Sequence, residues 1–379
     1  MTTHGELISF IEELVPLRYS EAWDNCGLQL GDPHWPLKGI LLALDVTPEV
    51  VAMAQELGAN FIFSHHPLLL TPVKTIRADQ FPGTVVQAAL TNGISVYAAH
   101  TNLDVIPGGV NDVLADLLGL INCKVLSPTS EVARYKLVVF VPPENLEEVS
   151  DAVFAAGAGK INHYSRCSFA GAGTGTFYPM AEATPYYGEV EEMNEVEEFR
   201  LEVSVEEYEL GQVIAALLDA HPYESPAFDV YALEQTGEAL GLGRLGEFPH
   251  AMSLGAAVGL IKGKLALAGV RVIGAGAPGG ERQEGQVKRI AVCGGSGFSL
   301  YQSAVAAGVD LYVTGDVKYH DARLVEAMGV PVVDAGHYAT EVPVLTVMQE
   351  EFRRFLRRRD DGQIKVDVCA RESDPFQGW

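Results

Sequence analysis

The sequence predicts an α/β protein, with a duplicated three-layer α/β unit of mostly parallel sheets and an inserted α+β domain. Three observations support this fold class. Short apolar strands alternate with helices near the N-terminus, the same series recurs near the C-terminus, and a carboxylate-rich segment separates the two. Because 379 residues exceed one ordinary domain, we place three parts at residues 1–130, 131–235 and 236–379.

The first part has the alternation of a parallel sheet. The apolar runs at residues 39–44, 61–63 and 94–98 are typical of buried strands. Helices are predicted between them, at residues 48–57 and 85–90. Polar residues directly follow each strand, at the edge of the sheet where ligands bind in open α/β folds.

The third part repeats this series. Strands are predicted at residues 289–293, 311–313 and 330–333, with helices between them. Residues 58–64 and 308–314 have the same order of glycine, small, polar and apolar residues. Each half also contains a histidine followed four residues later by a carboxylate. These correspondences favour an internal duplication over a chance likeness.

The middle part differs from both halves. Between about residues 135 and 233 the pattern becomes strand, helix, strand, strand, helix, strand, and carboxylates are frequent. This order is typical of a compact ferredoxin-like domain. We interpret it as an insertion, because the halves on either side need each other.

Composition excludes several classes of function. The formal charge of -24 argues against a nucleic-acid or anionic-membrane partner, although a local site could still bind a small phosphorylated ligand. Five scattered cysteines without a Cys-x-x-Cys pair indicate a reducing compartment and exclude a zinc ribbon. We see no signal peptide and no apolar window long enough to span a membrane, so we expect a cytoplasmic protein.

Five residues at strand ends form a candidate metal site. His65 and His66 follow one buried strand, and each half supplies a carboxylate four residues after a histidine, at Asp104 and at Glu341 after His337. Residues four apart share a helix face. Nitrogen and carboxylate ligands suit zinc, iron or manganese, and paired ions need a bridging group. We therefore predict two divalent ions, with zinc favoured.

Other polar residues could act on a substrate. His100 is the counterpart of His337, so it is either a further ligand or a group that faces the substrate. Asp45 and Asp316 each end a strand and could orient a ligand histidine or act as a general base, with a helix cap as an equal alternative for both. His320 is a further candidate, with Asp316, for proton transfer.

Two glycine-rich stretches are candidates for phosphate-binding loops. Residues 241–246 match G-x-G-x-x-G, but they lack the preceding strand and following helix that a dinucleotide site needs, so we reject it. Residues 294–297 lie between a strand and a helix and could cradle an anion, or could simply form a close turn beside the metals.

Several motifs together resemble the Nif-three-like dinuclear-metal proteins of the YbgI/YqfO type. The motifs are Trp23–Gln29, Ser64–Pro67, Ala99–Asp104, Thr314–Asp316 and Gly336–Glu341. Within the middle part, Gly173–Phe177 and His221–Asp229 look like the extra domain of the longer members. The resemblance covers nearly the whole chain.

The resemblance implies the same five metal ligands, a toroidal homohexamer and a middle domain like that of PII and CutA proteins. Members are often labelled GTP cyclohydrolase I type 2 homologues. Two hypotheses follow. The protein is a metal-dependent hydrolase of a small molecule, such as a nucleotide or phosphoester, or a non-catalytic metal-handling or regulatory protein whose insert senses a ligand.

Overall fold

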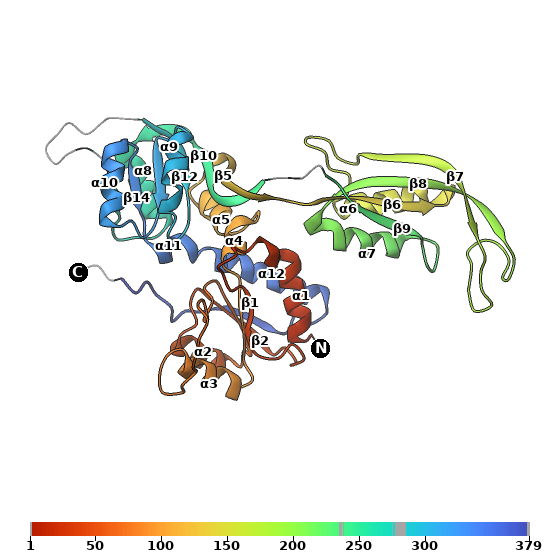
Figure 1. Cartoon of the computed structure of the whole chain (residues 1–379), viewed down its shortest axis with the longest axis horizontal. Helices are drawn as coiled ribbons and strands as arrows, with labels where there is room; N and C mark the ends of the chain where they lie inside the picture. The colour runs from red at the N-terminus through yellow and green to blue at the C-terminus, as the bar shows by residue number, and fades with distance from the viewer. Residues whose placement is uncertain (1, 235–236, 238, 275, 277–285, 377–379) are drawn as a thin grey trace. The chain divides into compact units, whose positions relative to one another are not determined.

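The computed structural model describes residues 2–234, 237, 239–274, 276 and 286–376 (Figure 1). The chain divides into two compact units. Unit 1 comprises Met1–Ser130 with Leu240–Trp379, and unit 2 comprises Glu131–Ala239. The predicted boundary between residues 235 and 236 falls outside the described residues. Each unit is described below by itself.

Unit 1 contains a five-stranded sheet of order β1-β4-β3-β2-β15, in which only β1 runs antiparallel to its neighbour. Its strands are β1 (Gly27–Leu30), β2 (Gly39–Ala43), β3 (Phe61–Ser64), β4 (Ser95–Ala98) and β15 (Lys365–Val368). β2, β3 and β4 are buried throughout, because helices cover both faces of the sheet.

Alternate side chains of these strands feed two helix layers. Leu42 and Phe63 pack into one core with helices α1 and α12, whereas Leu41 and Ile62 pack into another with α2 and α3. The helices are α1 (His4–Leu14), α2 (Pro48–Leu57), α3 (Gly83–Thr91) and α12 (Val344–Arg358). Thr3 and Glu6 form a capping box at the start of α1, which fixes where that helix begins.

The second sheet of unit 1 has six strands in the order β11-β14-β13-β12-β10-β5. Its strands are β5 (Ile121–Glu131), β10 (Ala239–Ser253), β11 (Arg271–Ile273), β12 (Gln286–Val292), β13 (Leu311–Thr314) and β14 (Val332–Asp334). β12, β13 and β14 pair parallel with one another, while β10 and β11 pair antiparallel to them. This sheet is therefore mixed, and the prediction of mostly parallel sheets holds only for the first.

The difference arises from β10 and β11, which the sequence pattern did not reveal. Residues 241–246, the rejected dinucleotide motif, lie inside β10 and are not a strand-to-helix turn. Their glycines carry no side chains that could give the apolar alternation of a strand. The remaining helices of unit 1 are α4 (Thr101–Val105), α5 (Val110–Leu117), α8 (Leu254–Lys264), α9 (Tyr301–Ala306), α10 (Tyr319–Met328) and α11 (His337–Glu341).

Unit 2 is a four-stranded antiparallel sheet of order β7-β8-β6-β9 with two helices on one face. In chain order its elements are β6 (Arg134–Val141), α6 (Leu146–Ala155), β7 (Ser168–Phe177), β8 (Asn194–Glu206), α7 (Leu210–Ala220) and β9 (Phe228–Ala232). Leu137, Val139 and Leu201 lie on the helix-covered face of the sheet and pack against Val153 and Leu217.

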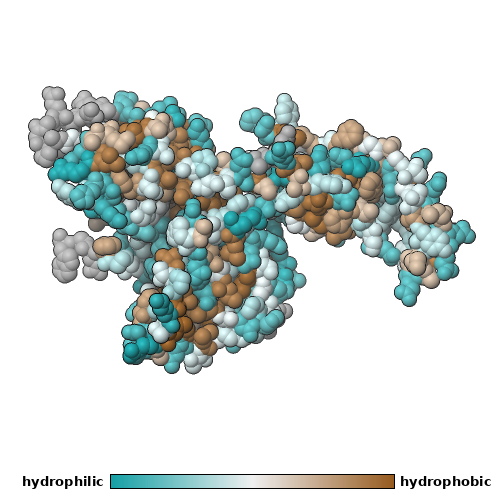
Figure 2. Space-filling model, in the orientation of Figure 1, coloured by the Kyte–Doolittle hydropathy of each residue, from teal (hydrophilic) through white to brown (hydrophobic). Residues whose placement is uncertain are grey.

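Hydrophilic side chains dominate the surface that Figure 2 shows, with hydrophobic groups gathered in smaller patches. Within the part of the chain that the structure describes, no helix combines the length and apolar character needed to cross a bilayer.

A buried arginine ties the two sequence halves of unit 1 together. Arg244 on β10 is only 4 % exposed, and its guanidinium contacts both carboxylate oxygens of Asp112 on α5. It also donates to the carbonyl oxygens of Gly241, Gly243 and Ile106 at 2.9, 3.0 and 3.3 Å. All five N–H donors of the guanidinium therefore have an acceptor. Because its charge is also paired with Asp112, the arginine can remain buried.

Replacing Asp112 with alanine should destabilise unit 1 by about 2–3 kcal/mol, because the buried guanidinium loses its counter-charge. Urea unfolding followed by tryptophan fluorescence would measure this, since the three tryptophans of the sequence, at positions 23, 35 and 379, all lie outside residues 131–239. Asp116→Ala, at an exposed position on the same helix, is the control and should change stability by less than about 0.5 kcal/mol. Equal effects of the two variants would contradict this role for Arg244.

Candidate metal centre

The candidate site lies in unit 1, at the carboxyl ends of strands from both sheets. His65 and His66 directly follow β3. His337 and Glu341 are the first and last residues of α11, which follows β14. One turn of helix separates them, so both side chains point to the same side.

Three side chains form a tight group. The Nε2 atoms of His66 and His337 each lie 3.0 Å from Oε2 of Glu341 and 3.3 Å from each other. Two donors bound to one zinc ion at about 2.1 Å would lie roughly 3.0–3.6 Å apart. These three atoms are thus spaced as ligands of a single ion would be.

His65 and Asp104 lie beside the other oxygen of the same carboxylate. Nε2 of His65 is 3.7 Å from Oε1 of Glu341 and 3.6 Å from Oδ1 of Asp104. The His65 ring is fully buried, and its Nε2 has no hydrogen-bond partner among the described residues. A buried nitrogen without a partner costs free energy, and a cation between these atoms would satisfy it.

The opposite nitrogen of each imidazole is held in place. Nδ1 of His65 lies 2.9 Å from the carbonyl oxygen of Ala99. Nδ1 of His66 lies 2.9 Å from Oδ1 of Asp45. Nδ1 of His337 lies 2.7 Å from Oδ2 of Asp316. Such contacts fix the orientation of a ligand imidazole and turn its Nε2 toward a metal. These contacts favour a role for Asp45 and Asp316 in orienting histidines over a role as helix caps. The residue that caps α2 is Thr47 and not Asp45.

His100 joins the cluster from the first half. Its ring centroid lies 5.2 Å from that of His65, and His65, His66 and His100 form a second group with metal-ligand spacing. Nδ1 of His100 contacts Oδ1 of Asp24 at 3.0 Å. Asp24 has a fully buried side chain that also accepts from the amide and hydroxyl of Thr101.

Asp24 is a site residue that sequence reasoning assigned no role. It lies in the Trp23–Gln29 motif, but nothing in that segment indicates which histidine it contacts. His320 behaves differently. It is exposed at the start of α10, its ring contacts Tyr319, and it belongs to neither histidine group. Its catalytic role stays a prediction without a supporting contact.

Gly295 permits the close approach of Glu341. A Cβ atom at this position would lie 2.0 Å from Oε1 of Glu341, and the backbone has a φ of +60° that favours glycine. The amides of Gly294, Gly295 and Gly297 donate to Asn111, Thr340 and Thr314, respectively. Because these amides are occupied, the contacts favour a close turn beside the site over an anion cradle for residues 294–297.

The electrostatics of the cluster favour a cation. Burial lowers the pKa of His66, but hydrogen bonds with Asp45 and Glu341 outweigh burial and raise it to about 10. A hydrogen bond that the His337 ring donates to Glu341 raises the pKa of His337 to about 9. Burial raises the pKa of Asp104 to about 6, and the neighbouring Glu341 charge adds to the rise. The buried Glu341 and the partly buried Asp104 carboxylates therefore hold positive charge nearby, and divalent ions could take the place of the protons.

The chain is similar to known proteins over nearly its whole length. The family model described as Duf34/NIF3 (NGG1p interacting factor 3) matches residues 2–375. Two relatives carry the name GTP cyclohydrolase 1 type 2 homolog. The one from Bacillus subtilis is 39% identical over 374 residues, covering 98% of this chain and 97% of the relative. The one from Halalkalibacterium halodurans is 38% identical over 372 residues, with the same coverage.

Solved structures give the same result. A Bacillus cereus protein described as related to NIF3 has a TM-score of 0.81 and 39% identity, covering 100% of this chain and 99% of that one. The Staphylococcus aureus protein SA1388 has a TM-score of 0.68 and 31% identity, with the same coverage. The family match over nearly the full length and these relatives show that the chain is a member of the Duf34/NIF3 family.

Proposed function

We propose that the cluster binds two divalent metal ions that share the Glu341 carboxylate. His66, His337 and Oε2 of Glu341 would hold one ion, and His65, Asp104 and Oε1 of Glu341 the other. The observation that carries this proposal is the convergence of three imidazole Nε2 atoms on the two oxygens of one buried carboxylate. Nitrogen and carboxylate ligands favour zinc, with iron or manganese as alternatives.

We further propose that the centre hydrolyses a small molecule, such as a nucleotide or phosphoester. Two bound ions would supply Lewis acidity and lower the pKa of water. His100 lies beside the cluster with its Nδ1 held by Asp24, so its Nε2 could accept or donate a proton there. Asp316 would act through His337, which it orients, and not on the substrate. The names of the relatives agree with a hydrolase but give no substrate for this chain.

A non-catalytic role in metal handling or regulation is the second candidate. The backbone amides of Gly294, Gly295 and Gly297 already donate hydrogen bonds to protein oxygens, so this turn is a poor site for a substrate phosphate. The occupation of these three amides supports a role without phosphoester substrates. A cavity in unit 2, described below, gives a regulatory ligand a place to bind. Metal-dependent turnover would separate the two candidates.

Four further expectations are part of the proposal. The strand and helix order of unit 2 supports a ferredoxin-like insert. An internal duplication is supported by Gly58 and Gly308, which both have a φ of +70° and precede strands that end at the site. A homohexamer and a cytoplasmic location rest on the family resemblance and on composition.

Metal content gives the first test. After loading with zinc and gel filtration, elemental analysis should find about two ions per chain. Glu341→Gln should lose most of both ions, whereas Asp104→Asn should retain about one, because only the shared carboxylate serves both positions. His34→Asn, at an exposed position outside both histidine groups, is the control and should bind as the parent does. Equal loss in Glu341→Gln and His34→Asn would contradict the assignment.

Turnover gives the second test. The metal-loaded protein should hydrolyse at least one member of a nucleotide and phosphoester panel that includes GTP ring opening. Asp104→Ala and Glu341→Ala should abolish this activity, and His100→Asn should reduce kcat by about 10²-fold or more while keeping its metal. Mass spectrometry of the products would identify the bond that is cleaved. If no metal supports turnover above the Ala variants, the hydrolase proposal fails and metal handling is favoured.

A further inference from the structure

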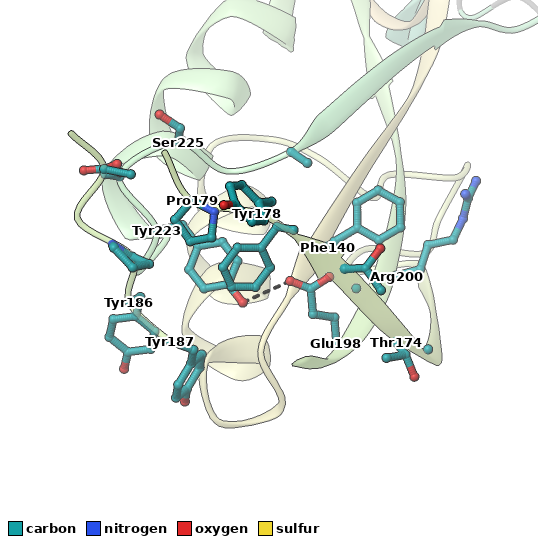
Figure 3. Close-up of a pocket in the computed structure, with 18 of the residues that line it drawn as sticks. Phe140, Thr174, Tyr178, Pro179, Tyr186, Tyr187, Glu198, Arg200, Tyr223 and Ser225 are labelled. Carbon is teal, nitrogen blue, oxygen red and sulfur yellow. Dashed lines mark hydrogen bonds between the residues drawn. The ribbon is translucent and has the colours of Figure 1, made fainter. Parts of the chain in front are cut away.

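Unit 2 contains a cavity of about 650 Å³, within the range of small-molecule sites (Figure 3). One wall is formed by β7 and the loop after it, at residues 171–179 and 183–187. The other walls are formed by β8 and by the loop before β9. All of these residues belong to unit 2, so the cavity shares no residue with the candidate metal centre.

The cavity lies over the middle of β7, where Gly171, Gly173 and Gly175 leave one face of the strand without side chains. Gly171 and Gly173 of β7 lie opposite Arg200 and Glu198 of β8, and paired residues of neighbouring strands point to the same face. Helices α6 and α7 pack on the other face, through residues such as Leu201. The alternating glycines therefore leave space beside the charged side chains of β8, where larger residues would fill it.

One carboxylate lies among aromatic rings in this space. Oε1 of Glu198 accepts a hydrogen bond of 3.0 Å from the hydroxyl of Tyr223, as Figure 3 shows. Tyr186 lies at the same wall, with its ring centroid 6.0 Å from that of Tyr223. Phe140, Tyr178 and Tyr187 also line the cavity.

Glu198 has no cationic partner among the described residues. Arg200 also lines the cavity, but it donates to Glu202 at 2.8 Å and lies over the Phe140 ring, 5.9 Å from its centroid. Its guanidinium points away from Glu198 in Figure 3, which leaves the tyrosine rings as the free aromatic faces beside this carboxylate. A carboxylate offers several acceptor positions, and the described residues use only one of them here. The cavity therefore places the negative charge of Glu198 next to the faces of aromatic rings.

The charge of unit 2 favours the same kind of ligand. Residues 131–239 contain 21 Asp and Glu against five Lys and Arg, a formal charge of -16 within the -24 of the whole chain. Such a field raises the local concentration of cations and disfavours anions.

We propose that this cavity binds a small organic cation, with the positive nitrogen next to Glu198 and its hydrocarbon part against the tyrosine and phenylalanine rings. Aromatic faces attract cations, and quaternary and primary ammonium groups are bound in this way. The proposal does not rest on metal binding or hydrolysis in unit 1. It gives the insert a ligand of defined charge and size.

The test is calorimetric titration of the full chain with matched probes. Choline and benzylamine are the cations, and 3,3-dimethyl-1-butanol and benzyl alcohol are their uncharged counterparts. At least one cation should bind about tenfold or more tightly than its counterpart. Glu198→Gln should weaken that binding about tenfold or more, while Glu197→Gln, a neighbouring exposed carboxylate outside the cavity lining, should leave it unchanged.

A second variant tests the location without changing charge. Gly173→Leu would fill the floor of the cavity, and the nearest atom to a new Cβ there is 4.0 Å away, so the backbone can accept it. We expect loss of cation binding with an unchanged circular dichroism spectrum. Equal affinity for charged and uncharged probes, no cation binding up to ~10 mM, or full binding by Gly173→Leu would each overturn the proposal.

Discussion

The shared carboxylate of Glu341 is the interaction on which the arrangement of unit 1 depends. Its side chain is 5 % exposed and lies within 3.0–3.7 Å of three imidazole nitrogens, two from the first half of the chain and one from the second. Burying an ionised carboxylate is costly unless positive charge surrounds it. The two sheets must therefore present their strand ends to each other, because neither half alone supplies enough partners.

The surrounding residues make this concentration of charge possible. Ala99, Asp45 and Asp316 fix the imidazole rings from behind, so each Nε2 is directed before any ion binds. Gly295 gives the carboxylate room at a position where any side chain would collide. The positions of the proposed ligand atoms thus depend on the Ala99 carbonyl, on two neighbouring aspartates and on the glycine backbone, as well as on the ligand residues themselves.

Sequence patterns revealed the parts of this protein that have strong local signals. β2, β3 and β4 are short apolar runs bounded by polar residues. The five proposed ligands lie just past strand ends or on the short helices that follow them, so their convergence could be anticipated. β10 was missed because its glycines obscure the alternation. The contact of Asp24 with His100 joins residues 76 positions apart, and no local pattern encodes such a contact. Family membership rests on motif content and on the relatives together.

The position of the insert has a consequence for how the chain can fold. β5 and β10 are neighbours in one sheet although more than a hundred residues separate them, so their pairing requires the closure of a long loop. Within unit 2, the first and last strands are also neighbours, with Tyr135 opposite Ala232. Once unit 2 has folded, its own ends are held together, and the loop left to close is only a few residues long. The insert thus reduces the entropic cost of completing the sheet that it interrupts, which makes early folding of unit 2 an advantage for the rest of the chain.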